Sequence, residues 1–79
     1  MYEERVLLPG GGVFELKLLE QMHYRLSFRR NRKLLVEYMG DGKRHGRQVR
    51  GRESAYAFKS VEQLRYDFER DAEDARRQG

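Results

Sequence analysis

The sequence lacks cysteine altogether, contains a single proline, and has no long apolar segment. Without cysteine, the fold cannot rely on disulfide bonds or thiolate metal sites, so apolar packing and backbone hydrogen bonds must stabilise it. Apolar runs such as residues 34–36 are far shorter than the roughly 20 residues that cross a bilayer, and the N-terminus has no charged-then-apolar signal pattern. We therefore expect a cytoplasmic protein that makes no contact with a membrane.

A chain of 79 residues leaves room for one small domain, spanning residues 1–79. Such a domain buries only about 60 to 65% of the surface that its unfolded chain exposes. Charged residues make up 38% of the chain, which approaches the composition of disordered proteins, but five tyrosines, four phenylalanines and one proline favour a folded domain. Because the core must be thin, a homodimer that buries further surface is one expectation.

Positive charge is concentrated in the middle of the chain. Residues 1–60 carry 13 basic and seven acidic side chains, whereas residues 61–79 carry four basic and six acidic ones. Residues 25–52 contain ten basic side chains but only two acidic ones, Glu37 and Asp41. Eight of the ten are arginine. The planar guanidinium group suits phosphate and carboxylate partners, so we expect an anionic partner. The arginines expected to bind this polyanion are Arg25, Arg29, Arg44, Arg47, Arg50 and Arg52.

Two strand-like runs flank the glycine-rich segment 9–12, and together they predict a β-hairpin. A P-loop is excluded, because no Lys-Ser/Thr pair and helix follow these glycines. With residues 9–11 as the loop, one face of the hairpin is apolar and the other pairs opposite charges. The expected partners are Val6 and Phe14, Arg5 and Glu15, and Glu3 and Lys17.

A second hairpin is predicted from residues 23–29 and 33–39, which alternate apolar and polar side chains as half-buried strands do. We expect residues 30–32 to form its turn, with Asn31 in the left-handed region of backbone space. The expected partners are Phe28 and Leu34, Leu26 and Val36, Tyr24 and Tyr38, and Arg25 and Glu37.

Residues 40–53 are rich in glycine and arginine, and the glycines break any period. We expect a loop there, with at most a short strand around residues 47–50, so that the strands are confined to residues 4–39.

A helix is predicted over residues 60–77. Ser60-Val61-Glu62-Gln63 has the pattern of a capping box, in which the serine hydroxyl accepts the Gln63 amide and the Gln63 side chain reaches back. An apolar stripe follows at helical spacing and consists of Val61, Leu64, Phe68, Ala72 and Ala75. The stripe should dock on the sheet, although the same spacing also suits self-association through a coiled-coil seam.

The expected fold class is therefore α+β: a small antiparallel sheet of about four strands, arranged as two hairpins, with one C-terminal helix packed on one face.

His45 is the one candidate for a catalytic residue. It lies among glycines and arginines in residues 41–47, where an imidazole could transfer protons while arginines hold a phosphodiester, as RNA cleavage requires. A basic segment with one histidine also occurs in proteins that only bind nucleic acid. No second histidine is nearby in sequence, so the partner would have to be Asp41, Glu37, Tyr38 or the distant His23. We therefore expect binding without efficient cleavage.

No metal site or cofactor is expected, because the two histidines fit no ligand spacing and cysteine is missing. His23 is typical of an exposed strand residue. Tyr56 and Phe58, just before the helix, could stack on unpaired bases beside the arginines. The alternative is that they pack where the loop meets the helix.

Two blocks of the chain have a recognisable pattern: the residues from Ala55 to Leu64, continued by Asp67-Phe68, and residues 29–38. With these blocks the C-terminal half, residues 38–72, resembles the TumE-type toxins of prokaryotic toxin–antitoxin systems. The first block is similar to that family's Tyr-x-Phe junction and helix, and the second to the turn and strand that precede its Tyr-Asp-Asn motif. Members of the family are small proteins with short strands, a basic histidine loop and a final helix.

The chain departs from that family at its polar motifs. Tyr38 is followed by Met39-Gly40 in place of Asp-Asn, and the His-x-His loop reads His45-Gly46-Arg47. The resemblance therefore implies the fold more than the activity.

Charge and resemblance together predict a small toxin-like protein of a mobile or stress-response module, which binds RNA or another polyanion through an arginine-rich face. The alternative is a non-enzymatic inhibitor or adaptor, for example phage-encoded, that binds an acidic protein such as an antitoxin or a host nucleic-acid-processing complex. In a third interpretation the basic surface is only solvated and binds no polyanion.

Overall fold

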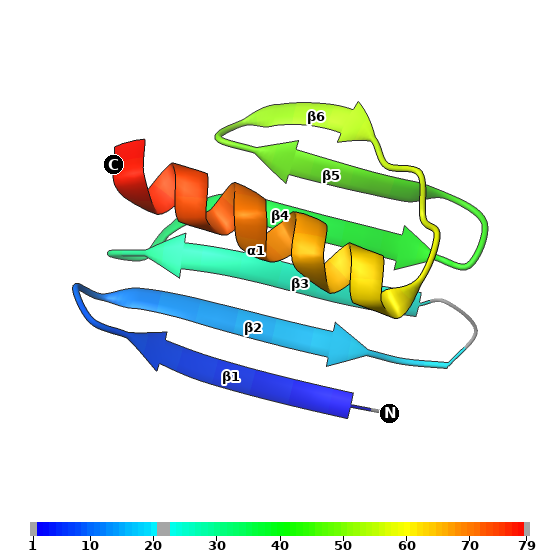
Figure 1. The fold of residues 1–79 in the computed structure, drawn as a ribbon, viewed down its shortest axis with the longest axis horizontal. Helices are drawn as coiled ribbons and strands as arrows, with labels where there is room; N and C mark the ends of the chain where they lie inside the picture. The colour runs from blue at the N-terminus through cyan, green and yellow to red at the C-terminus, as the bar shows by residue number, and fades with distance from the viewer. Residues whose placement is uncertain (1, 21–22, 79) are drawn as a thin grey trace.

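Six strands form one antiparallel sheet in which each strand pairs with the next along the chain, and one helix crosses a face of that sheet (Figure 1). This is a computed structural model that describes residues 2–20 and 23–78. In chain order the elements are β1 (Tyr2–Leu8), β2 (Gly12–Leu18), β3 (His23–Arg30), β4 (Lys33–Asp41), β5 (His45–Val49), β6 (Arg52–Ala55) and α1 (Val61–Gln78).

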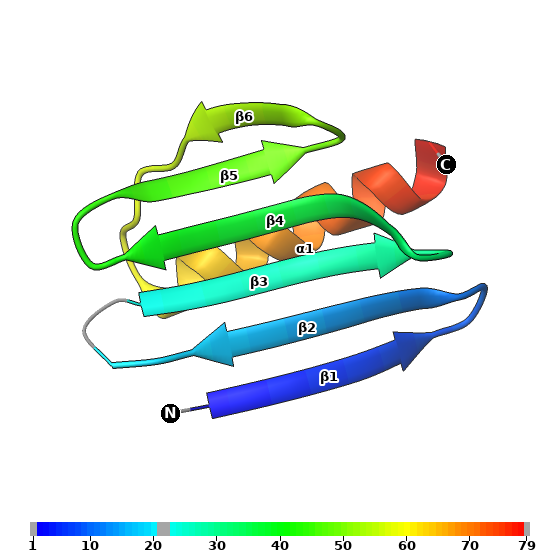
Figure 2. The ribbon, with the colours of Figure 1, turned by 180° about the vertical axis from the view of Figure 1, so that it is seen from behind.

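The two faces of the sheet differ in what covers them. The face against α1, here called the helix face, holds the apolar core over β3 and β4. The other face, here called the open face, is turned away from α1, and none of the described residues forms a helix on it (Figure 2). Of the part of the chain that the structure describes, no helix is long and apolar enough to cross a membrane.

The prediction of about four strands is wrong, because residues 40–55 contain strands in place of most of the expected loop. β4 continues to Asp41, and a tight turn follows in which the Asp41 carboxylate accepts the backbone N–H groups of Lys43 (3.1 Å) and Arg44 (2.8 Å). A second turn places Arg50 and Gly51 at φ of 52° and 86°. Glycines that appeared to break a period therefore mark turns between short strands.

The first hairpin has the predicted register. Val6 lies opposite Phe14, and Arg5 lies opposite Glu15. The pairing of apolar with apolar and acid with base was sufficient to determine which residues face each other.

The predicted register of the second hairpin is wrong. Asn31 adopts the expected left-handed conformation, but Arg32 does so too (φ 53° and 68°), so the turn has two residues rather than three. A β-bulge between Phe28 and Arg29 shifts the pairing again, and Phe28 lies opposite Val36. Bulges leave no periodic trace in a short strand, so the pattern alone could not reveal this one.

The predicted helix and its docking are confirmed. Ser60 Oγ accepts the Gln63 N–H at 3.1 Å, although the Gln63 side chain bonds to Asp67 rather than reaching back. Of the predicted stripe, Leu64, Phe68, Ala72 and Ala75 are buried against the sheet, while Val61 remains 48% exposed.

Candidate functional site

A row of side chains across the helix face leads from the core to a polar cluster. Cross-strand pairing aligns Leu16, Leu26, Tyr38, Arg47 and Ser54 on successive strands from β2 to β6. The helix packs over β3 and β4 and does not extend across β5 and β6 (Figure 1). The row therefore changes from apolar to polar at Tyr38, where the cover by α1 ends.

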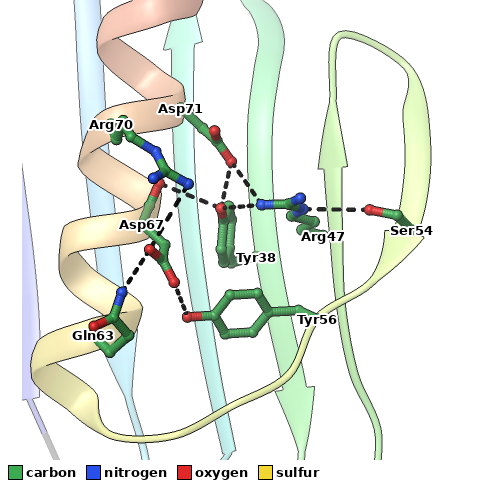
Figure 3. Close-up of polar contacts among 8 residues, drawn as sticks. All are labelled: Tyr38, Arg47, Ser54, Tyr56, Gln63, Asp67, Arg70 and Asp71. Atoms are coloured by element: carbon green, nitrogen blue, oxygen red, sulfur yellow. Dashed lines mark hydrogen bonds and ion pairs between the residues drawn. The ribbon is translucent and has the colours of Figure 1, made fainter.

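The centre of the cluster is a chain of hydrogen bonds that joins β5 to β4 and α1 (Figure 3). Arg47 Nη1 donates to the hydroxyl oxygen of Tyr38 at 3.2 Å, and that hydroxyl donates to the carboxylate of Asp71. Arg47 also forms an ion pair with Asp71 at 3.4 Å, and its Nε donates to Ser54 Oγ at 3.3 Å. Three side chains, from β4, β6 and α1, thus hold the guanidinium of Arg47 in place.

Proton affinities agree with these donor roles. Burial raises the pKa of Tyr38 to about 12, and the hydrogen bond to Asp71 acts in the same direction. Tyr38 therefore remains a protonated donor at neutral pH. The hydrogen bond with Tyr38 raises the pKa of Arg47 above its ordinary value, so the guanidinium stays charged.

A second carboxylate, that of Asp67, lies one turn earlier on α1 and next to this cluster (Figure 3). Asp67 accepts hydrogen bonds from Tyr56 Oη at 2.7 Å and from Gln63 Nε2 at 2.8 Å, and Arg70 lies 3.9 Å away. The bond from Tyr56 is the main reason that the pKa of Asp67 lies below its ordinary value. Tyr56 is thereby engaged within the protein, in line with the packing interpretation of this residue.

A pocket of about 490 Å³ opens beside Arg47, between β5, β6 and α1. We call it the Arg47 pocket, and it is lined by Arg47, Val49, Arg50, Arg52, Ser54 and Asp71. Among the described residues of its lining, three are arginines and one, Asp71, is a carboxylate, which is already bonded to Tyr38 and Arg47.

Basic side chains from three separate segments gather at the end of the sheet next to this pocket. The turns from β3 to β4 and from β5 to β6 lie at this end, together with the C-terminus of α1 (Figures 1 and 2). Arg30 Nη1 donates to the carbonyl of Arg76 at 3.1 Å, which joins the helix to the first of these turns. We call this region the basic end, and its basic residues are Arg30, Arg32, Lys33, Arg50, Arg52, Arg76 and Arg77.

Another cavity, of about 710 Å³, opens at the basic end between the same two turns. Its lining includes Arg30, Lys33 and Arg50, together with the apolar side chains of Leu34 and Leu35. At the helix terminus, Glu73 forms ion pairs with Arg76 and Arg77 at 2.7 and 3.2 Å. Part of the charge here is thus balanced locally, whereas Arg32 and Lys33 stand exposed at the turn.

The six arginines expected to bind a polyanion do not form one surface. Arg25 and Arg29 lie on the open face, and Arg25 forms an ion pair with Glu37 at 3.6 Å. Arg44 lies at the opposite end of the sheet, in the turn from β4 to β5. The remaining three, Arg47, Arg50 and Arg52, meet in the Arg47 pocket.

His45 begins β5 and belongs to a cluster of three aromatic rings. Its ring stacks on Phe58 and Tyr24, with centroids 5.1 and 5.6 Å apart, and its Nδ1 lies 2.9 Å from Tyr24 Oη. Burial raises the pKa of Tyr24 to about 12. Gly40 provides the space, because a Cβ there would lie 2.8 Å from His45 Nδ1 and would overlap the Tyr24 ring. We call this cluster the His45 end.

This environment favours a structural role for His45. One ring nitrogen is already hydrogen-bonded to Tyr24, and the ring contacts two aromatic side chains that also contact each other. Strand alternation places His23 on the open face, so the two histidines lie on opposite sides of the sheet. Within residues 2–20 and 23–78, no three His, Asp or Glu side chains are grouped as metal ligands would be.

Sequence reasoning missed the residues that hold Arg47. Asp67 and Asp71 are spaced by four and flank the buried stripe of α1, which places two carboxylates on the rim of the face that meets the sheet. That spacing was a usable signal, but nothing in the sequence showed which strand they would meet. Arg30, Arg32 and Lys33 were counted in the basic segment but were not singled out, because their position at a turn beside the helix terminus is a tertiary feature.

No protein-family model, curated protein or solved structure matches this chain.

Proposed function

We propose that the protein binds the phosphate backbone of RNA or another polyanion through the basic end, without efficient catalysis. The observation that carries this proposal is the convergence of basic side chains from two turns and a helix terminus at one end of the sheet. Side chains that project from turns can follow a polymer of regularly spaced charges. A protein with this surface would serve as the RNA-binding part of a toxin-like module.

Binding without cleavage is proposed because the groups needed for acid–base catalysis are not together. Phosphodiester cleavage needs a base for the attacking hydroxyl and an acid for the leaving oxygen. His45 is stacked at the opposite end of the sheet, and His23 is on the other face. The basic end supplies cations, which bind and orient a phosphate but do not transfer protons.

The test is a fluorescence-anisotropy titration of a labelled, unstructured RNA over a range of salt concentrations. Binding through phosphates predicts that the logarithm of the association constant falls linearly with the logarithm of salt concentration, by about 0.7 for each phosphate contact. Affinity should then fall severalfold or more between about 50 and 200 mM salt. Salt-independent binding, or no binding in dilute buffer, would contradict the proposal and favour an acidic protein as the partner.

A further inference from the structure

The Arg47 pocket differs from the rest of the basic end in that its central cation is fixed. Exposed arginines lose side-chain entropy when they bind a ligand, whereas a guanidinium already held by the protein loses less. Arg47 is held through Nε by Ser54 and through Nη1 by Tyr38 and Asp71. Its Nη2 group takes part in none of these contacts, and its side chain keeps 34% of its surface exposed.

The hydroxyl of Ser54 is poised to donate into the same space. Because Ser54 Oγ accepts the hydrogen bond from Arg47 Nε, the serine proton is not used in that contact. Ser54, Arg47 and Arg52 all line the pocket. An oxyanion placed there would meet donors from two neighbouring strands.

Size and charge agree with one phosphate and part of its nucleoside. A volume of about 490 Å³ lies within the range of roughly 300 to 1,000 Å³ typical of small-ligand sites. The guanidinium groups of Arg47 and Arg52 favour an anion that carries several acceptor oxygens, and their planar shape matches phosphate geometry. Asp71, the one carboxylate among the described lining residues, is bonded to Arg47 and Tyr38 and therefore orients the Arg47 guanidinium.

We propose that the Arg47 pocket is a phosphate subsite, in which Arg47 Nη2, Arg52 and the Ser54 hydroxyl bind one phosphate group. The proposal rests on the proposed function, since the phosphate belongs to a polyanion lying across the adjacent basic end. Tyr38 and Asp71 are positioning residues that orient Arg47. An internal phosphodiester and a terminal phosphate present the same oxygens, so both could occupy the subsite.

The first test compares two variants that preserve charge, Arg47→Lys and Arg44→Lys. Long-range electrostatic attraction is the same for both variants, because lysine keeps the positive charge. If Arg47 binds phosphate through its fixed guanidinium, Arg47→Lys should lower RNA affinity by about tenfold. Arg44→Lys, in the exposed turn at the opposite end of the sheet, should change it by less than about twofold. Equal affinities of the two variants, each folded by its thermal melt, would overturn the subsite while leaving binding at the basic end intact.

In the second test, simple electrostatics and a positioning role of Asp71 predict changes in RNA affinity of opposite sign. Asp71→Asn and Asp74→Asn each remove one negative charge from α1, so simple electrostatics predicts tighter RNA binding for both. If Asp71 orients Arg47, Asp71→Asn should weaken binding about threefold or more, because a charge-assisted partner of the guanidinium is lost. Asp74→Asn should leave binding unchanged or slightly tighter. Tighter binding by Asp71→Asn would overturn the positioning role.

The third test uses inorganic phosphate alone and separates the subsite from polymer binding. In wild type, the nuclear magnetic resonance signals of the Arg47 side chain and of the Ser54 amide should shift as phosphate is added. In Arg47→Lys, the Ser54 amide signal should not shift. Shifts spread equally over all exposed arginines would overturn the subsite. If phosphate shifts these signals while RNA does not bind, the subsite stands and the proposed function fails.

A final arm distinguishes the two sources of the phosphate. RNA that carries a 5′-phosphate is compared with the same RNA carrying a 5′-hydroxyl, in wild type and in Arg47→Lys. If Arg47→Lys lowers affinity more for the 5′-phosphorylated RNA, the subsite binds a terminal phosphate. If it lowers affinity equally for both RNAs, the subsite binds a phosphodiester. If it lowers affinity for neither RNA, the proposal is overturned.

Discussion

The two ends of the sheet use their polar and aromatic side chains in opposite ways. At the His45 end, the rings of Tyr24, His45 and Phe58 contact one another, and the polar atoms of two of them bond to each other. At the basic end, charged side chains stand at turns and beside a pocket that is open to solvent. The residue that looked most like a catalyst is therefore part of the packing, while residues that looked like simple surface charge surround the cavities.

The course of the chain explains this difference. The segment that carries Tyr56 and Phe58 leads from β6 to the start of α1 and covers the His45 end (Figure 1). The helix ends over the opposite end, where its C-terminal carbonyls attract cations and Arg30 donates to one of them. One end is covered by aromatic residues, and the other attracts positive charge.

The largest effect should come from Phe68→Ala, which tests whether both ends depend on one core. Phe68 is fully buried and contacts the rings of Phe14 and Tyr38, with centroids 5.7 and 5.8 Å apart. Its loss should reduce the free energy of unfolding by about 3 to 5 kcal/mol. Urea unfolding followed by NMR signals from both ends should show them melting together. A melt unchanged by Phe68→Ala, or loosening of one end alone, would break this part of the comparison.

Tyr66→Ala is the matched control for that substitution. Tyr66 lies on the same helix but is 61% exposed, and its ring contacts Arg70 at the surface. Its removal should cost less than about 1 kcal/mol.

His45→Ala should destabilise the His45 end and leave RNA chemistry unchanged. The variant loses two ring contacts and the hydrogen bond to Tyr24, which together contribute on the order of 1 to 3 kcal/mol. Incubation with labelled RNA should give the same low background of cleavage for wild type and variant. Robust cleavage that disappears in His45→Ala would show that this end is catalytic after all. His23→Ala, at an exposed strand position, serves as the control for stability.

Two double variants test the charge at each end directly. One double variant combines Arg32→Gln and Lys33→Gln at the basic end, and the other combines Lys43→Gln and Arg44→Gln at the opposite end. Each removes two positive charges. The first pair should lower RNA affinity by roughly tenfold and reduce the salt slope by about 1.4, as expected for two lost phosphate contacts. The second pair should change affinity by less than about threefold. Equal losses would mean that overall charge, rather than the basic end, controls binding.

The smallest effect concerns acid stability near the start of α1. Tyr56 holds the pKa of Asp67 below its ordinary value of 3.8, so the unfolded chain binds this proton at higher pH than the folded one. The stabilisation is therefore complete above the unfolded pKa and is lost as pH falls through the folded pKa. Between about pH 5 and 3, the melting temperature of wild type should fall more than that of Asp67→Asn. The difference corresponds to less than about 1 kcal/mol, and parallel curves would show that Asp67 gains nothing from Tyr56.

Much of the fold could be predicted where sequence pattern and burial coincide. The first hairpin was placed in its register because both of its faces carry complementary pairs. The helix was placed because Ser60 caps it and an apolar stripe runs along it. The conformation of Asn31 followed from the preference of asparagine for left-handed backbone.

Strands β5 and β6 could not be recognised in the same way. Alternation of apolar and polar residues reports a strand only when one face is buried, and these strands extend beyond the cover of α1. Arg47 and Ser54 therefore sit where a buried strand would carry apolar residues. The missed strands and the missed site have the same cause.

Sequence pattern was enough to predict the first hairpin, the helix with its buried stripe, and the excess of arginine in the middle of the chain. Which arginines meet, and what His45 contacts, depends on the three-dimensional fold. Arg47 joins Tyr38 and Asp71, which lie nine and 24 residues away along the chain, because cross-strand register and helix docking bring them together. Local pattern carries no information on such distances, since they depend on how strands pair and where a helix crosses them.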